Sequence, residues 1–170
     1  MNPLDIIAKY YPVGSEAYRI LVIHSRSVAD KALAIARMHP EMNLDLTFVE
    51  EAAMLHDIGI FRCNAPDIDC HGDAEYICHG YLGAELMRAE GYPRHARVCE
   101  RHTGTGITLA MIEERGLPLP HRDFMPETLE EQLICYADKI LQQNETGQRK
   151  ICRKGKTGPF EVWKRNCRTV

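Results

Sequence analysis

Apolar residues recur every three or four positions through most of the chain, which is the period of helices that bury one face. This spacing predicts a short helix over Leu4–Tyr11 and a long helix that Ser15 caps and that runs to about Met38. A capping-box pattern, Thr47-x-x-Glu50, predicts the start of a third helix that ends near residue 56. No segment alternates apolar and polar residues as a half-buried strand does, so the pattern predicts an all-α fold.

Further helices are predicted in the second half of the chain, where glycine and proline separate them. They cover about residues 79–90, a segment ending at 102, and residues 108–115, 130–143 and 160–168. The segment Ile60–Cys78 is rich in turn residues and acids, which predicts a loop. A loop beside a buried polar cluster commonly forms the rim of a site, so His71 and Asp73 in this loop are rim candidates.

Length and composition are typical of one globular domain. With 170 residues and 45% hydrophobic content, the chain is long enough for one core and short for two. We expect a single domain over 1–170, with its core over about 15–143 and a basic connector and C-terminal helix over 144–170. The formal net charge of -3 gives no basic surplus, so we expect no nucleic-acid polymer as a partner.

The composition of the chain favours a cytoplasmic location. The first nine residues lack a basic leader followed by an apolar core, and no apolar run approaches the length of a membrane span. The seven cysteines are odd in number and form no Cys-x-x-Cys pair, which argues against a disulfide framework. We expect free thiols, with Cys99 and Cys135 acting as small apolar residues of helices.

Histidine and aspartate residues recur on the apolar sides or at the ends of predicted helices. His56, for example, follows Ala52 and Ala53 by four and three positions, so a helix points its ring toward the core. A single inward histidine is more often a hydrogen-bonded core residue than a ligand. A buried ionised carboxylate, however, is costly unless a cation meets it. The inward positions are His24, His56, Asp57, His79, His102 and Asp138.

This set of side chains has the chemistry of a metal site. Imidazole and carboxylate ligands suit divalent first-row metals such as iron or manganese, and the absence of cysteine disfavours a structural zinc site. Six ligands exceed what one ion with an open position needs, so the set predicts two ions. Asp57 is the expected bridge, because a carboxylate has two oxygens to offer and a neutral imidazole has one lone pair.

The order of these residues resembles a known family. His24, then His56-Asp57-Ile58-Gly59, then Asp138 in Tyr136-Ala137-Asp138-Lys139 are similar to the signature of the HD-domain metal-dependent phosphohydrolases, in the His-Asp-Ile-Gly form. The likeness spans about 21–141. It implies an all-helical HD-domain bundle with an internal metal site, in which the six side chains named above are the ligands.

Two further segments narrow the resemblance. The stretches around His79-Gly80-Tyr81 and Arg101-His102-Thr103-Gly104 are similar to the extra histidine motifs of the two-metal HD branch, which includes the bacterial symmetrical diadenosine tetraphosphatases. The segment from Gly116 to Asp138 looks closer still to a small uncharacterised group of His-Asp-Ile-Gly proteins.

The resemblance implies hydrolysis of a small phosphorylated substrate, a nucleotide or dinucleotide, by water that divalent ions activate. Asp57, Arg101 and Lys139 are the expected catalytic residues, the two basic ones by supplying positive charge beside the ligands, and Arg62 on the loop is a further candidate.

Two alternatives to a phosphohydrolase stay open at this stage. One is a diiron oxygenase that uses the same ligand set, and the other is a non-catalytic HD domain that binds a nucleotide as a sensor. The metal, the substrate and the oligomeric state are not defined by the sequence. His39, His95 and His121 are interpreted as surface or capping residues.

Overall fold

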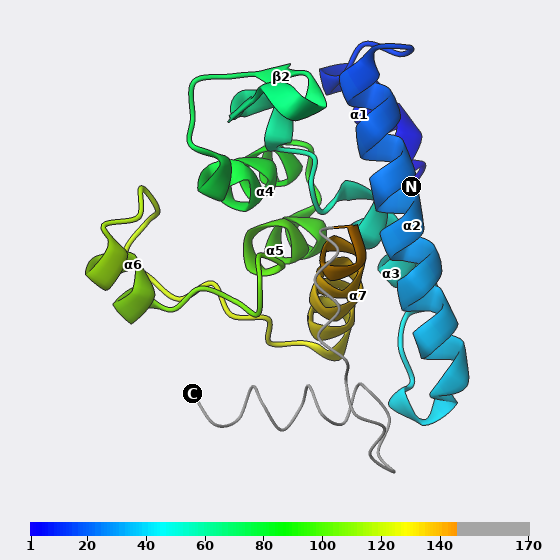
Figure 1. The fold of residues 1–170 in the computed structure, drawn as a ribbon. Helices are drawn as coiled ribbons and strands as arrows, with labels where there is room; N and C mark the ends of the chain where they lie inside the picture. The colour runs from blue at the N-terminus through cyan, green and yellow to red at the C-terminus, as the bar shows by residue number, and fades with distance from the viewer. Residues whose placement is uncertain (146–170) are drawn as a thin grey trace.

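The longest helix, α2 (Glu16–Met38), packs against α3 (Leu46–Leu55) and α7 (Leu129–Glu145). The structure is a computed structural model that describes residues 1–145. Figure 1 shows α2 running along one side of the molecule, with α7 beside it, α5 (Pro93–Arg101) next to α7 and α4 (His79–Ala89) next to α5. These helices confirm the predicted all-α fold.

Two shorter helices complete the helical part. The first, α1 (Pro3–Tyr10), precedes α2 and packs on α3, and the other, α6 (Leu109–Arg115), extends away from the bundle (Figure 1). A small apolar cluster that includes Cys78, Ile112 and Phe124 joins this extension to the rest of the molecule. Predictions on residues 146–170, the basic connector and the C-terminal helix, lie outside the described residues.

The local signals predicted the start of α2 correctly and that of α3 wrongly. Ser15 caps α2 by accepting a hydrogen bond from the Tyr18 N–H at 3.1 Å. In α3 the cap is Asp45, which accepts from the Phe48 N–H at 3.0 Å, and the predicted capping box at Thr47 does not form. Asp45 is an equally good cap and comes two residues earlier, so Thr47 is already inside the helix.

The predicted loop between α3 and α4 is built from short 3₁₀ turns and one minimal hairpin. Strands β1 (Asn64–Ala65) and β2 (Cys70–His71) pair antiparallel, with Asn64 opposite His71 and Ala65 opposite Cys70. Two residues are too few for an alternating pattern, which is why the sequence did not predict these strands. The segment ends in a 3₁₀ turn, Tyr76–Cys78, that leads directly into α4.

The main core lies between α2, α3, α5 and α7 and includes Val28, Val49, Leu55 and Ile134. Cys99 and Cys135 are fully buried, as expected of small apolar residues of helices. The interpretation of His95 as a surface residue was wrong, because this side chain is buried against the Phe48 ring. Among residues 1–145, no helix is both long and apolar enough to cross a membrane.

Candidate metal centre

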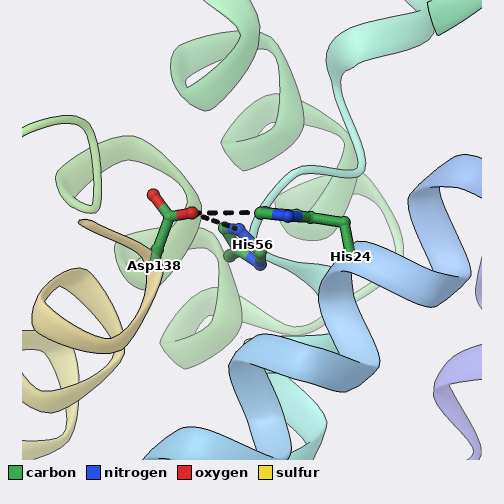
Figure 2. Close-up of side chains that lie close together, drawn as sticks. All are labelled: His24, His56 and Asp138. Carbon is green, nitrogen blue, oxygen red and sulfur yellow. Dashed lines mark ion pairs between the residues drawn. The ribbon is translucent and has the colours of Figure 1, made fainter. Parts of the chain in front are cut away.

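Five separate segments bring the six predicted ligands to one buried place inside the bundle. Figure 2 shows three of them converging: His24 from the middle of α2, His56 from the turn after α3, and Asp138 from α7. Asp57 follows His56 in that turn. The other two are His79, the first residue of α4, and His102, which follows the last residue of α5.

The first group of ligand atoms lies around the Asp138 carboxylate. Its Oδ1 is 3.2 Å from Nε2 of His24 and 3.8 Å from Nε2 of His56, the two ion pairs dashed in Figure 2. Oδ2 of Asp57 is 3.5 Å and 3.4 Å from the same two nitrogens. Two imidazoles and two carboxylates from three helical segments therefore share one small volume. Three of these side chains, His24, His56 and Asp138, are close enough together to hold a metal ion by themselves.

The second group lies on the other oxygen of Asp57. Oδ1 of Asp57 is 3.3 Å from Nε2 of His79 and 3.2 Å from Nε2 of His102, and those two nitrogens are 3.0 Å apart. The three atoms form a nearly equilateral triangle. Asp57 thus directs one oxygen to each group, which is the arrangement expected of a carboxylate that bridges two sites.

The backbone fixes the protonation of three of the rings. Nδ1 of His56, His79 and His102 lies 2.6, 2.6 and 2.7 Å from the carbonyl oxygen three residues earlier. A carbonyl only accepts hydrogen bonds, so each Nδ1 carries the proton and donates it. In the neutral ring Nε2 then presents a lone pair, which is the state required of a metal ligand.

Burial and neighbouring charges act in opposite directions on these groups. Burial raises the pKa of Asp57, but the imidazoles of His56, His102 and His79 outweigh it and hold the pKa well below its usual value. Burial lowers the pKa of His79, which favours its neutral form. Burial also lowers the pKa of His56, but Asp57 and Asp138 outweigh that effect and raise it.

These atoms fit a divalent cation. Ligands at right angles around an ion with bonds of about 2.1 Å are about 3.0 Å apart, close to the 3.0–3.3 Å edges of the second triangle. Nε2 of His56 is fully buried and has no hydrogen-bond partner among the described residues. A buried lone pair without a donor is costly, and a cation would satisfy it.

A cavity of about 410 Å³ opens beside this centre, and His24 and Asp57 are part of its lining. The rest of the lining is mainly apolar and comes from α2, from the segment between α3 and α4, and from Tyr11 at the end of α1. Arg19 and Tyr76 are lining residues that sequence reasoning missed. Their signal is weak, because Arg19 lies five positions before His24 and the folding of residues 60–78 against α2 is a long-range event.

The predicted basic residues have the following surroundings. Arg101 donates through Nη1 to the Met125 carbonyl at 2.8 Å and pairs with a Glu127 carboxylate oxygen at 2.5 Å. Lys139 is half-buried beside Asp138 on α7 and makes no ion pair with the residues that the structure describes. A role for either side chain in substrate binding or catalysis stays a prediction.

The remaining loop candidates lie at the surface. Arg62 is 3.8 Å from a Glu85 carboxylate oxygen, and both side chains are a little less than half exposed, at 44% and 45%. His71 is exposed and its Nε2 lies 3.3 Å from Asp69, while Asp73 is exposed as well. Their roles at the rim of the site also stay predictions.

Comparison with known families identifies the chain. The model of the HD domain family matches residues 21–142, which contain all six candidate ligands. The chain belongs to the HD domain family. This confirms the family resemblance, but nothing in the comparisons supports the narrower likeness to the diadenosine tetraphosphatases.

Several curated proteins contain a segment similar to this HD domain. A tRNA (cytidine(56)-2'-O)-methyltransferase of Thermoplasma volcanium is 34% identical over 139 residues, which are 81% of this chain and 35% of the methyltransferase. A protein of the same name from Picrophilus torridus is 32% identical over 126 residues, 74% of this chain and 32% of its own. An uncharacterised protein of Methanocaldococcus jannaschii is 36% identical over 124 residues, 71% of this chain and 66% of its own.

The matched region thus spans about a third of each methyltransferase and just under two thirds of the uncharacterised protein. No solved structure matches the chain significantly.

Proposed function

We propose that this HD domain is a divalent-metal-dependent phosphohydrolase that acts on a small phosphorylated compound, a nucleotide or dinucleotide. The observation that carries the proposal is Asp57, whose two oxygens each face a separate pair of imidazoles. A set that divides in this way suits two ions rather than one. When bound, divalent cations lower the pKa of water toward neutrality and neutralise charge on phosphate oxygens.

The protein's own side chains prepare this chemistry before the substrate arrives. His56, His79 and His102 are held by their Nδ1–H bonds to the backbone, so their Nε2 atoms are aimed without further rearrangement. Asp57 and Asp138 stay ionised, because the surrounding imidazoles keep the pKa of both carboxyl groups low despite their burial.

The open side of the centre is the cavity beside His24 and Asp57. Its volume of about 410 Å³ is within the usual range for small-molecule sites and suits a mononucleotide better than a polymer. We propose that the phosphate of the substrate binds at the His24 and Asp57 end of this cavity. Lys139, next to Asp138, is the proposed additional positive charge.

The methyltransferase relatives bear on substrate class rather than on reaction. About two thirds of each of those chains lies outside the matched segment, which leaves room there for methyl transfer to tRNA. The buried histidine and aspartate set supports hydrolysis for the matched part instead. Enzymes named for tRNA modification contain a segment similar to this chain. This association with nucleic-acid chemistry also supports a nucleotide as the substrate.

The proposal is tested by phosphate release from a panel of nucleoside mono-, di- and triphosphates, dinucleotides and sugar phosphates. The protein is assayed after loading with manganese, iron, cobalt, nickel or zinc, with its metal content measured. Asp57→Asn keeps the shape of the side chain and should abolish turnover. The matched control is His39→Ala, which removes a histidine whose Nδ1 lies 3.0 Å from a carboxylate oxygen of Glu41, away from the centre, and it should keep full activity.

Other outcomes would select another function. Tight nucleotide binding without phosphate release would select the sensor alternative, and substrate-dependent oxygen consumption by the iron-loaded protein would select the oxygenase. Methyl transfer to tRNA that is lost in Asp57→Asn would contradict a hydrolytic role for the centre.

A further inference from the structure

The lining of the cavity beside the metal centre combines polar and apolar side chains. The polar ones include His24 and Asp57, which belong to the centre. The apolar part includes Ile20 and Ile23 from α2 and Ile68 from the segment between the two strands. A ligand that fills this cavity therefore carries an apolar or aromatic group next to its charged group.

Two of the side chains that line the cavity are large, apolar and exposed. Ile23 is 54% exposed and Tyr76 is 47% exposed, and they are two of only six such residues in the described chain. They come from different elements, α2 and the 3₁₀ turn before α4. Exposed apolar side chains gathered at one concave site indicate a surface that a ligand covers.

Tyr76 is tied to the metal centre at close range. Its ring lies 4.7 Å from the His79 ring, centroid to centroid, with an interplanar angle of 33°. Its carbonyl oxygen accepts the Nδ1–H of the same histidine at 2.6 Å. One part of the phenol ring is therefore occupied by the imidazole, and the exposed part is available to the cavity. An aromatic face fixed in this way is suited to stack on another planar ring.

We infer that the cavity is a nucleoside subsite in which Tyr76 stacks on the base and Ile23 covers it, with the phosphate directed to His24 and Asp57. The inference rests on the proposed function for the reaction, but the subsite itself does not require turnover. Arg19 is the only lysine or arginine among the described lining residues, and it is already paired with Glu16. The lining therefore favours a neutral planar group over a second phosphate.

The test separates the subsite from the reaction by using ligands that cannot be hydrolysed at phosphate. Binding of adenosine, guanosine, cytidine and uridine is measured by ligand-observed NMR titration and compared with binding of free ribose. At least one nucleoside should bind more tightly than ribose. Tyr76→Ala should weaken the binding of that nucleoside at least about tenfold, whereas Tyr76→Phe, which keeps the ring, should retain the parent affinity.

Two further variants serve as controls for the nucleoside titrations. Tyr76→Leu keeps bulk without an aromatic face and should behave like Tyr76→Ala. Met38→Ala removes another exposed apolar side chain of α2, 76% exposed and outside the cavity, and should leave nucleoside binding unchanged. Metal content is measured in each variant, because Tyr76 touches His79.

Two results overturn the inference: no nucleoside binds better than ribose, or Tyr76→Ala binds nucleosides as the parent does. Both apply even if the protein releases phosphate from nucleotides. Conversely, nucleoside binding that depends on Tyr76 without any phosphate release would contradict the proposed function and leave the subsite standing.

Discussion

Nε2 of His79 and Nε2 of His102 face each other at 3.0 Å, although each ring already donates its Nδ1–H to a backbone carbonyl. Two neutral rings in this state present lone pairs to each other, and the nearest oxygen of Asp57 is a third acceptor. A proton or a metal cation must lie among these three atoms for the arrangement to be favourable. His79 begins α4 and His102 follows α5, so an ion bound here would contribute to the packing of these two helices.

Removal of the metal should therefore lower the stability of the fold. We expect chelation to lower the melting temperature and readdition of the ion to restore it. An ion present at about 100 times its dissociation constant contributes about 2.7 kcal/mol. Thermal unfolding followed by circular dichroism, with and without chelator, measures the effect. Asp57→Asn should melt at the same temperature in both conditions, and a chelator effect that persists in this variant would place the ion elsewhere.

Replacing Asp57 and replacing His102 should have different effects on metal content. Asp57→Ala removes an oxygen from both groups and should strip the protein of both ions, with helical content largely retained. His102→Ala removes a ligand from the second group alone and should cost about one equivalent. Elemental analysis of the purified variants measures the ratio. Unchanged stoichiometry in His102→Ala would mean that only the four signature residues coordinate.

Much of the helical framework and the inward placement of the candidate ligands were predictable, because the signals for both are local. Ser15 caps its helix through a neighbour three residues away, and Pro93 and Gly116 mark helix boundaries by their own backbone preferences. The helical period told which way His56 points before any contact was known. Its Nδ1 partner, the carbonyl three residues earlier, is also a local consequence of a position at a helix end.

The cavity was not predictable in the same way. Tyr76 and Ile23 are 53 positions apart in sequence, and nothing near either residue shows that they line one space. That depends on how residues 60–78 fold back on α2. The surroundings of Arg101 have a similar origin, because its pairing with Glu127 requires the segment after α6 to return to α5.

The pairing of Glu127 with Arg97 and Arg101 should contribute stability that depends on pH. The hydrogen bonds from Arg97 and then Arg101 lower the pKa of Glu127 to about 2. Because this pKa lies below that of the unfolded chain, the contribution is present at neutral pH and is lost as the pH falls from about 4.5 toward about 2. Glu127 is largely exposed, so the contribution should be below about 1 kcal/mol.

The measurement is the difference in urea midpoint between the parent and Glu127→Gln at pH 7 and at pH 3. The difference should be smaller at pH 3. Glu114→Gln, an exposed glutamate on α6, is the control and should show no difference at either pH. If Glu127→Gln changed the urea midpoint by the same amount at pH 7 and at pH 3, the charge of the carboxylate would not contribute to stability.

The glycine of the His-Asp-Ile-Gly segment is required for space. Gly59 has an ordinary φ of -81°, but a Cβ there would lie 2.2 Å from the His79 carbonyl oxygen and 2.4 Å from the Gly83 nitrogen. These are backbone atoms of α4, so Gly59→Ala must displace the helix that begins with His79. We expect a loss of at least about 1–3 kcal/mol in unfolding free energy together with reduced metal content.

The matched control for Gly59→Ala is Gly91→Ala, which introduces the same methyl group where nothing lies within 4 Å but φ is +85°. That variant should cost about 1–2 kcal/mol through backbone strain and keep its full metal content. Urea unfolding and elemental analysis of both variants separate the two effects. If Gly59→Ala kept its metal while losing stability, the contact between the turn and α4 would serve the fold without positioning His79. Full stability and full metal content would mean that α4 does not approach the turn this closely.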